Sequence, residues 1–489
     1  MQRTIADAGW RFDNSYARLP EPLFTRSTPA PVRTPALVLV NEPLAVDLGL
    51  DPAILREEGA ALCAGNELPP GAEPIAQAYA GHQFGTFTNL GDGRAILLGE
   101  HRAPDGRRVD LQLKGAGRTR YSRGGDGRAA LGPMLREYLV SEGMHALGIP
   151  TTRSLAVAAT GEWILRTTPL PGAVLTRVAA SHIRVGTFEY AAAVEEPGLL
   201  PALLEHAIAR HAPAAAEADD PAEAFLDIVV QRQAALVARW MLVGFVHGVM
   251  NTDNMAVSGE TIDYGPCAFL DAYDPATVFS SIDRQGRYAY GNQPAIAHWN
   301  LARFAETLLP AMRGDTDDAR LETARRVLDT FPARYEAAHL AGARAKLGLT
   351  TAEEGDRDLF AELLRRMHGA AADFTTTFAS LASVGDAGGP ATPLVGMLGD
   401  WLAAWRARLA REPGSRPEAV ARMRRANPVV IPRNQRVEEA LAAAEAGDLA
   451  PVHRLLGAIR DPFGETPANE PYRAGPPPGC GAYRTFCGT

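Results

Sequence analysis

The chain has 489 residues, 46% of them hydrophobic and 22% charged, and a formal net charge of −8 at neutral pH. This composition is typical of a soluble globular protein of roughly two or three domains, and its acidic balance argues against nucleic acid as a main partner, since proteins that bind nucleic acid present a strongly basic surface. No apolar run approaches the roughly 20 residues that span a bilayer, and residues 1–10 lack the apolar stretch of a signal peptide, so we expect no membrane partner and a cytoplasmic location.

Residues 1–74 are rich in proline, and we expect them to form an N-terminal wrapping segment with little regular structure. Over 75–190 the pattern indicates strands interrupted by glycines. The Gly-Asp-Gly sequence at 91–93 is a turn signal ahead of an apolar strand. Residues 108–114 alternate apolar and polar side chains as a half-buried strand does, and this predicted strand ends at Lys114.

Lys114 is one of only two lysines, although lysine and arginine together number 49. Arginine does not replace lysine where a compact ammonium group must meet phosphate oxygens, and protein kinases carry such a lysine on a strand. The alternative is that one of the two remaining lysines falls there without a function.

A loop rich in glycine and arginine follows at 115–128 and could bring backbone N–H and guanidinium groups against phosphate. Pro133 then begins a predicted helix that runs to about residue 143 and carries Glu137. Strand, lysine, loop, helix and glutamate is the order in which kinases build their Lys–Glu ion pair. Taken alone, Glu137 would be interpreted as a solvated helix residue.

Strands are also predicted at 154–158 and 162–166. Arg177 and Arg184 follow; a helical segment would put both near one face, and the alternative is two ordinary surface arginines. The second half of the chain is predicted to be mainly helical, with helices at 224–246, 299–310, 318–345, 355–368, 394–411 and 434–447 and an extended or mobile tail from Pro471.

The helix at 224–246 leads into His247, which begins a segment with Asn254 seven residues later and Asp263-Tyr264-Gly265 beyond it. Protein kinases use H-x-D-x-x-x-x-N followed by D-F-G, in which the asparagine and the second aspartate hold the metal ions on the nucleotide. Here Val249 stands where the kinase base would be. A chain that keeps the metal ligands and loses this base either does not transfer a γ-phosphoryl group or transfers something else.

Long segments of the chain resemble the selenoprotein O family, the YdiU-like protein adenylyltransferases. These segments are 12–16, 81–85, 90–95, 121–129, 147–153, 247–255, 262–266, 292–297, 299–303, 431–434 and 481–489. The resemblance implies an α+β, protein-kinase-like bilobal fold. We expect the wrapping segment at 1–74, a small β-rich lobe at 75–190, a mainly helical large lobe at 191–345, and a helical C-terminal extension with a mobile tail at 346–489.

The family transfers AMP from ATP to Ser, Thr or Tyr hydroxyls of proteins and releases pyrophosphate; whether UTP also serves as a donor of UMP stays open. By resemblance, ATP is bound in the reverse orientation to a kinase, and Asp253 accepts the proton of the hydroxyl. Glu137 pairs with Lys114, and Asn254 and Asp263 hold Mg²⁺ or Mn²⁺. The residues that the resemblance places at the nucleotide are Gly91, Gly93, Arg94, Lys114, Asp126, Gly127, Arg177, Arg184 and Asp263.

The chain departs from the family pattern in two places. The sequence at 131–134 replaces a more usual polar Arg-Ser-Ser run before the helix that carries Glu137. Some members have a redox cysteine after the D-Y-G segment that pairs with a C-terminal one, whereas this chain has Ser280 and Ser281 there. A regulatory disulfide of Cys487 therefore stays open, with Cys267 as the other candidate. The four cysteines are too few for a disulfide framework.

Two other classes of function remain. A phosphotransferase on a small molecule shares the His, Asn and D-x-G pattern but carries aspartate at the position of Val249. The other class is a non-catalytic nucleotide-binding scaffold. The intact set of Lys114, Glu137, Asn254 and Asp263 counts against it, because a scaffold has no need of metal ligands. For Asp253, the alternative roles are a second metal ligand or a loop cap.

Overall fold

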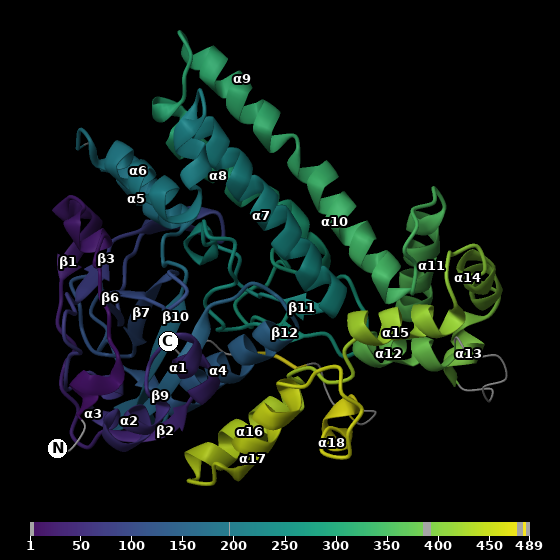
Figure 1. Cartoon of the computed structure of the whole chain (residues 1–489), viewed down its shortest axis with the longest axis horizontal. Coiled ribbons are helices and arrows are strands. Elements are labelled where there is room, and N and C mark those ends of the chain that lie inside the picture. The colour runs from purple at the N-terminus through teal and green to yellow at the C-terminus, as the bar shows by residue number, and fades with distance from the viewer. Residues whose placement is uncertain (1–3, 195, 385–392, 477–482, 486–489) are drawn as a thin grey trace.

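The computed structural model describes residues 4–194, 196–384, 393–476 and 483–485, and its fold is mixed α and β, with a sheet lobe beside a helical region (Figure 1). Within these residues the main sheet has eight strands, all of whose recorded pairings are antiparallel. The path of neighbouring strands is β1 (Phe24–Arg26), β3 (Ile75–Gln77), β6 (Ala95–Arg102), β7 (Arg108–Lys114), β10 (Pro169–Ala179), β9 (Arg153–Leu165) and β2 (Ala36–Val40), with β8 (Ala129–Ala130) on β10.

The N-terminal segment is more regular than its proline content predicts. β1 and β2 form the two edges of the main sheet, and three short helices lie between β2 and β3: α1 (Glu42–Asp47), α2 (Pro52–Glu58) and α3 (Ala60–Ala64). Two of these helices begin with a proline in their first turn and a side-chain cap, from Asn41 and Asp51. Proline is compatible with the first turn of a helix, so the expectation of little regular structure was wrong.

β7 lies in the middle of the sheet, where Lys114 is paired with Ala95 of β6 and with Leu175 of β10. The strands predicted at 154–158 and 162–166 are one strand, β9, which forms a long hairpin with β10. Arg177 lies on β10 and Arg184 immediately precedes α5 (Val185–Ala193), so the suggestion of a shared helical face was wrong. The sheet turns Arg177 inward, and its side chain is buried.

Helix α4 (Leu131–Ala146) packs against β9 and β10 on one side and against α16 and α17 on the other (Figure 1). The helical region begins with α5, α6 (Leu199–His211) and the long α7 (Pro221–Val243), whose first turn is capped by Asp220 and whose end is a left-handed Gly244. The elements that follow are β11 (Phe245–Val246), β12 (Ala268–Phe269), α8 (Gln293–Leu308), α9 (Asp317–Leu328) and α10 (Phe331–Lys346).

The remaining helices are α11 (Asp356–Gly369), α12 (Phe374–Val384), α13 (Pro393–Leu398), α14 (Trp401–Leu409), α15 (Arg416–Ala426), α16 (Asn434–Glu445), α17 (Ala450–Ile459) and α18 (Glu470–Arg473). The single helix predicted at 318–345 is divided into α9 and α10 near Pro332, and that at 394–411 is divided at Gly399, which has a positive φ. Proline and left-handed glycine both interrupt a helix.

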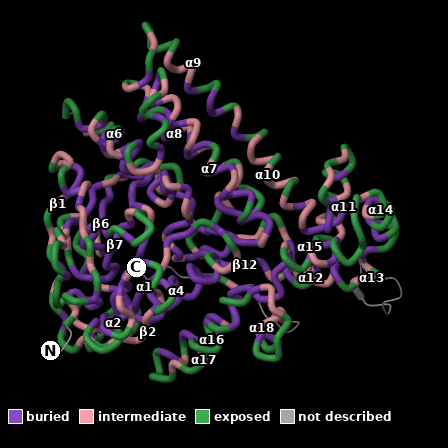
Figure 2. The backbone as a smooth tube through the Cα atoms, viewed as in Figure 1, coloured by how far each residue is buried: buried purple, intermediate pink, exposed green. Residues whose placement is uncertain are grey.

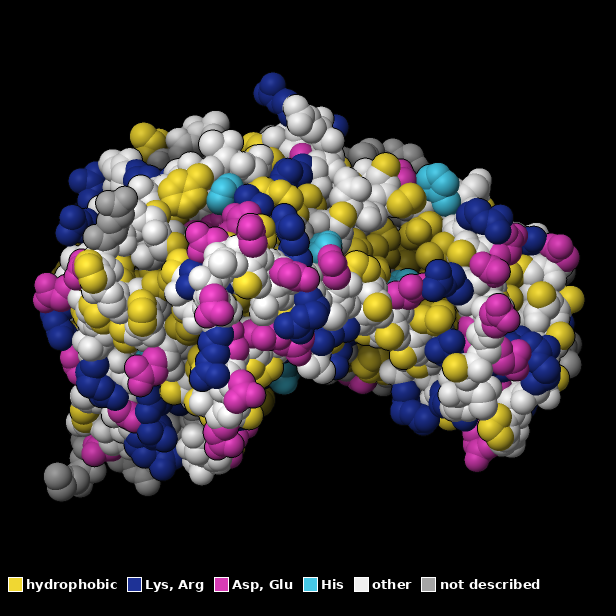
Figure 3. Space-filling view, turned by 90° about the horizontal axis from the view of Figure 1, so that it is seen from above, with side chains coloured by type: hydrophobic (Ala, Val, Ile, Leu, Met, Phe, Trp, Pro, Cys, Tyr) yellow, Lys and Arg dark blue, Asp and Glu magenta, His cyan; other side chains and the backbone are white. Residues whose placement is uncertain are grey.

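Buried positions concentrate on the sheet, on α4 and on α7, which packs between α8 and α10 (Figure 2). Acidic and basic side chains are interspersed over the face seen in Figure 3. In the part of the chain that the structure describes, every helix is too short or too polar to cross a membrane.

Lys346 at the end of α10 is a buried cation. Its side chain lies over the Phe378 ring, with Nζ 4.1 Å from the ring centre, and no carboxylate of the described residues lies within ion-pairing distance. Burial lowers the pKa of Lys346 to about 7. Between about pH 7 and pH 10.5 the unfolded chain keeps a proton on Lys346 that the folded chain has lost, so stability rises with pH over this range. Below pH 7 both states carry the proton, and the folded state bears the full cost of burying the charge.

Replacing Lys346 by methionine should therefore raise the midpoint of thermal unfolding at pH 7, and this gain should shrink as the pH approaches 10. The physical reason is that methionine fills the site without a charge. Lys346→Arg is the matched control, because arginine cannot lose its proton, and it should lower the midpoint. A methionine variant less stable than the wild type at pH 7 would contradict the assignment.

Candidate active site

Three cations and two carboxylates meet where the sheet lobe faces the loop after β11. Lys114 Nζ lies 2.6 Å from Glu137 Oε2 on α4 and 3.1 Å from Asp263 Oδ1. Arg177 on β10 donates from Nε to Glu137 Oε1 at 2.7 Å and from Nη2 to Asp263 Oδ1 at 2.7 Å. The lysine and glutamate thus form the ion pair that the order of elements predicts, and Arg177 adds a second cation to it.

Asp263 is the centre of this cluster. Arg184 donates from Nη1 to Asp263 Oδ2 at 2.8 Å and from the same nitrogen to the main-chain oxygen of Asp253 at 2.8 Å. Burial alone would raise the pKa of Asp263, but Arg177, Lys114 and Arg184 hold it well below its usual value. The carboxylate is therefore ionised at neutral pH.

The cluster forms one wall of a cavity of about 470 Å³. Of the residues predicted to serve the site, the cavity is lined by Gly93, Arg94, Lys114, Arg177, Arg184, Asp253, Asn254 and Asp263. Val249, which stands in place of the kinase base, lines it too. Segments from β6, β7, β10 and the loops around 249–265 therefore converge on one cavity.

The other predicted nucleotide residues line an adjoining hollow of about 720 Å³, which shares Tyr79, Gly93 and Arg94 with the first. Gly91, Asp126 and Gly127 lie there. Asp126 forms an ion pair with Arg166 at 2.8 Å. The glycine- and arginine-rich loop thus forms the outer part of a cleft whose inner part holds the charged cluster.

Asp253 is the buried middle residue of a short 3-10 turn, Thr252–Asn254. Its Oδ1 has no hydrogen-bond partner among the described residues. Burial raises the pKa of Asp253 to about 6, and Arg184 partly offsets that effect. A buried carboxylate with a free oxygen and a raised pKa is suited to accept a proton near neutral pH.

Gly81 on the small hairpin of β4 (Ala80–Gln83) and β5 (Thr86–Asn89) packs directly on Asp253. A Cβ at position 81 would lie 2.8 Å from Asp253 Cβ and nearer still to Oδ1. Real Cβ atoms do not approach so closely, so only glycine leaves the carboxylate where it is.

Gly81→Ala should therefore displace Asp253 and lower turnover on the order of 100-fold, which is the cost of misplacing a reacting group by about 1 Å. The free energy of unfolding should fall by only about 1–3 kcal/mol, the cost of an overpacked contact, because the φ of Gly81 lies outside the strained range. Gly457→Ala on α17 is the control, since a Cβ there meets nothing within 4 Å, and it should keep full activity. Full activity in Gly81→Ala would show that the position of Asp253 does not matter.

Asn254 and Asp263 are the residues that could hold a divalent cation. Both offer hard oxygen ligands, and the amide nitrogen of Asn254 is already engaged, donating to Val249 O at 3.0 Å, which leaves its oxygen for a metal. The described residues contain no group of three or more His, Cys, Asp or Glu arranged to bind a metal. Mg²⁺ in nucleotide sites takes only one or two carboxylates, the rest of its ligands being phosphates and water, so the residues present fit such an ion.

Asp92 is a cavity residue that the sequence did not single out. It is buried, and Oδ2 accepts hydrogen bonds from Gln77 N at 3.1 Å and Gln112 Nε2 at 3.2 Å. Burial raises the pKa of Asp92 to about 6. The Gly-Asp-Gly sequence indicated only a turn; the signal that could have found Asp92 is a charged residue between two glycines of a phosphate-facing loop.

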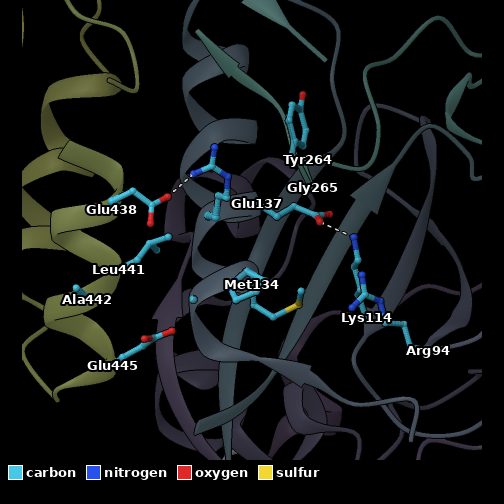
Figure 4. A pocket seen from close by; sticks show the side chains of 13 residues that line it. Arg94, Lys114, Met134, Glu137, Tyr264, Gly265, Glu438, Leu441, Ala442 and Glu445 are labelled. Atoms are coloured by element: carbon cyan, nitrogen blue, oxygen red, sulfur yellow. Dashed lines mark hydrogen bonds and ion pairs between the residues drawn. The ribbon is translucent and has the colours of Figure 1, made fainter. Parts of the chain in front are cut away.

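A further cavity, of about 240 Å³, has both Lys114 and Glu137 in its lining (Figure 4). Residues of α16, among them Glu438 and Glu445, face α4 across it. Arg136 on α4 donates to Glu438 Oε1 at 3.0 Å and to Tyr483 Oη at 3.0 Å. The helix that carries Glu137 is thus braced by C-terminal residues that the sequence did not connect with the site.

Cys487 lies outside the described residues, so a regulatory disulfide between it and Cys267 stays open. Cys267 is buried, and its main-chain oxygen accepts a hydrogen bond from Arg136 Nη2 at 2.6 Å. Ser280 forms a parallel bridge with Thr485. The chain's last described residues therefore lie beside the segment after D-Y-G.

Convergent cations, two acidic side chains with opposite pKa shifts and a glycine-rich rim define a site suited to a polyphosphate nucleotide. Comparison with known proteins agrees with this class. A family model described as "Protein adenylyltransferase SelO" matches residues 9–460. A relative from Geobacillus kaustophilus named "Protein nucleotidyltransferase YdiU" is 60% identical over 488 residues, which cover 99% of this chain and 100% of the relative. A relative of the same name from Cereibacter sphaeroides is 58% identical over 486 residues, which cover 98% of this chain and 100% of the relative.

The chain therefore belongs to the SelO family. It is an enzyme of the nucleotidyltransferase class.

Proposed function

We propose that this enzyme transfers AMP from ATP to Ser, Thr or Tyr hydroxyls of protein substrates and releases pyrophosphate. The observation that carries the proposal is a bridge made by Arg184. Its Nη1 donates to the main-chain oxygen of Asp253 and to Asp263 Oδ2, at 2.8 Å each. The cations that suit a triphosphate and the carboxylate that suits a hydroxyl are thus held together in one cavity. The names of the relatives, protein nucleotidyltransferase and protein adenylyltransferase, support a protein acceptor and a nucleotide donor.

The proposal includes a kinase-like arrangement with the nucleotide reversed. Lys114, Arg177 and Arg184 lie deepest, where they would bind the β and γ phosphates and stabilise the leaving pyrophosphate. The glycine-rich loop with Gly91, Asp126 and Gly127 would then accommodate the rest of the nucleotide. In domain terms, we assign the small lobe to 75–190, the large lobe to 191–345, and the flanking segments to 1–74 and 346–489.

Asn254 and Asp263 would hold Mg²⁺ or Mn²⁺. Bound there, the ion supplies Lewis-acid polarisation of the phosphate oxygens. The side chains of this chain do the remaining work. Glu137 orients Lys114 and Arg177, and Arg184 fixes Asp253 through its main-chain oxygen.

Asp253 would accept the proton of the acceptor hydroxyl while the hydroxyl oxygen attacks the α-phosphorus of ATP. The bond from that phosphorus to the bridging oxygen breaks, and pyrophosphate leaves with both electrons. General-base help of this kind contributes about 10²- to 10⁴-fold. Val249 is consistent with this assignment, because no base is needed at the place of a kinase's γ-phosphoryl acceptor.

Incubation with Mg²⁺ or Mn²⁺ and ATP labelled at the α or the γ position tests the proposal. Label on protein from the α position alone is the expected result. Label from γ alone would make the enzyme a kinase, and tight ATP binding without any label would make the chain a scaffold. The same experiment with α-labelled UTP decides whether UMP is also transferred.

A further inference from the structure

Two exposed apolar side chains stand at the mouth of the cavity that holds Asp253. Phe84 is 36% exposed and Ile282 is 59% exposed, and both line that cavity. They come from different elements, since Phe84 is at the tip of the β4–β5 hairpin and Ile282 is on the loop that follows β12. A molecule that reaches Asp253 through this mouth meets apolar surface on two sides.

The hairpin tip is fixed to the loop that carries Asp253. Phe84 N donates to Asn251 Oδ1 at 3.1 Å, and His82 N donates to Thr252 Oγ1 at 2.7 Å. Phe84 has a φ of 50°, a left-handed conformation that is an outlier for a bulky residue. Such strain persists only where the surroundings hold it, and it concentrates at functional sites. The backbone that carries the Phe84 ring is thus fixed to the loop that carries the Asp253 carboxylate.

Ile282 also belongs to a well-connected loop. Asp283 accepts hydrogen bonds from Arg287 N at 3.0 Å and Tyr288 N at 2.8 Å, and Ser281 N donates to Thr485 O at 3.1 Å. The neighbouring backbone is therefore held in place while the Ile282 side chain is left in solvent. Exposed apolar side chains that are held in place beside a reactive cavity suit contact with a partner.

Arg287 brings a positive charge to the hairpin tip, next to Phe84 and outside the cavity lining. A Cβ on Gly85, at the hairpin tip, would lie 3.6 Å from the Arg287 guanidinium carbon. That guanidinium lies 4.8 Å from the centre of the Trp299 ring. Among the described residues no carboxylate comes within ion-pairing distance of it. The charge is therefore available to a partner.

We propose that Phe84, Ile282 and Arg287 recognise the acceptor segment of the substrate protein. This segment would be extended, with a bulky apolar residue next to the hydroxyl residue and a carboxylate side chain beyond it. The apolar side chain packs between Phe84 and Ile282 while the hydroxyl reaches Asp253, and the carboxylate pairs with Arg287. The inference rests on the proposed function, because the hydroxyl group must enter by the mouth that Phe84 and Ile282 line.

The test measures transfer from α-labelled ATP to three synthetic peptides with one threonine each. The first has leucine next to the threonine and glutamate further along, the second has serine in place of leucine, and the third has glutamine in place of glutamate. The full chain is compared with Phe84→Asn, which tolerates the left-handed backbone, and with Ile282→Ser and Arg287→Gln. Leu165→Ser on β9 is the matched control, since Leu165 is also exposed but does not line the cavity.

We expect the wild type to prefer the first peptide to the second about tenfold in kcat/KM, as an apolar contact allows. Phe84→Asn and Ile282→Ser should each reduce that preference to below threefold, with KM for ATP within twofold of the wild type. Arg287→Gln should remove the preference of the first peptide over the third. Leu165→Ser should behave as the wild type.

Equal use of the three peptides by the wild type, or preferences that survive in the variants, would overturn the inference and leave the proposed function standing. Label found only on the chain's own hydroxyls would do the same. Label from the γ position, or none at all, would overturn the proposed function and this inference with it.

Discussion

Asp263→Ala should abolish AMP transfer, with a loss of roughly 10³-fold or more. Two effects combine. The variant lacks one of the two proposed metal ligands, and the bound ion would supply several kcal/mol of charge stabilisation. It also leaves Lys114, Arg177 and Arg184 without the carboxylate that all three contact. The measurement is the single-turnover rate with α-labelled ATP at saturating Mg²⁺.

Binding of ATP in the presence of a chelator separates this role from simple loss of the fold. The three cations remain in Asp263→Ala, and Glu137 still pairs with Lys114 and Arg177. Because the variant removes only the competing Asp263 carboxylate, metal-free binding should stay within about tenfold of the wild type. Asp274→Ala is the matched control, because Asp274 lies outside the cavity lining. There it accepts a hydrogen bond from Ala276 N and lies 3.9 Å from His368 Nδ1. Transfer retained by Asp263→Ala would remove this residue from the metal site.

Asp253→Asn should lower kcat by about 10²- to 10⁴-fold and leave KM for ATP nearly unchanged. The carboxylate must be ionised to accept a proton, and burial raises its pKa from an ordinary 3.8 to about 6. Wild-type activity should therefore fall as the pH drops through about 6, and the residual activity of the variant should show no such step. A pH profile of kcat from 5 to 8 measures both.

Stability provides an independent check on Asp253. Because its folded pKa is raised, the acid contributes stability below its unfolded pKa, and that contribution is lost as the pH rises through about 6. Asp253→Asn should consequently be as stable as the wild type at pH 7, or more stable by up to about 3 kcal/mol, with no gain at pH 4. Glu260→Gln is the control. Burial raises the pKa of Glu260 to about 7, but this residue does not line the cavity that holds Asp253. The variant should therefore keep the fall in kcat below about pH 6. An unaltered profile in Asp253→Asn would exclude Asp253 as the base.

Short-range patterns account for much of the fold. The alternation at 108–114 predicted β7, and the apolar run at 224–246 predicted most of α7. Helices such as α6 and α17 escaped prediction, although α17 has a strongly one-sided apolar pattern and α6 is rich in leucine. The two divided helices show the same limit, since one proline or one glycine decided where each helix was interrupted.

By itself the sequence determined the chemical inventory of this protein: a rare lysine at a strand end, a glutamate on the next helix, and an asparagine and an aspartate at kinase-like spacing without the kinase base. These are local facts, because strand alternation, turn glycines and motif spacing depend on neighbours along the chain. Only the tertiary structure decided that Arg177 and Arg184 meet Asp263, that Gly81 confines Asp253, and that Phe84 and Ile282 flank one opening. Such contacts join residues that are far apart along the chain, as Lys114 and Asp263 are at a separation of 149 positions. Their pKa shifts and distances arise from burial and packing, which have no signature in any short segment.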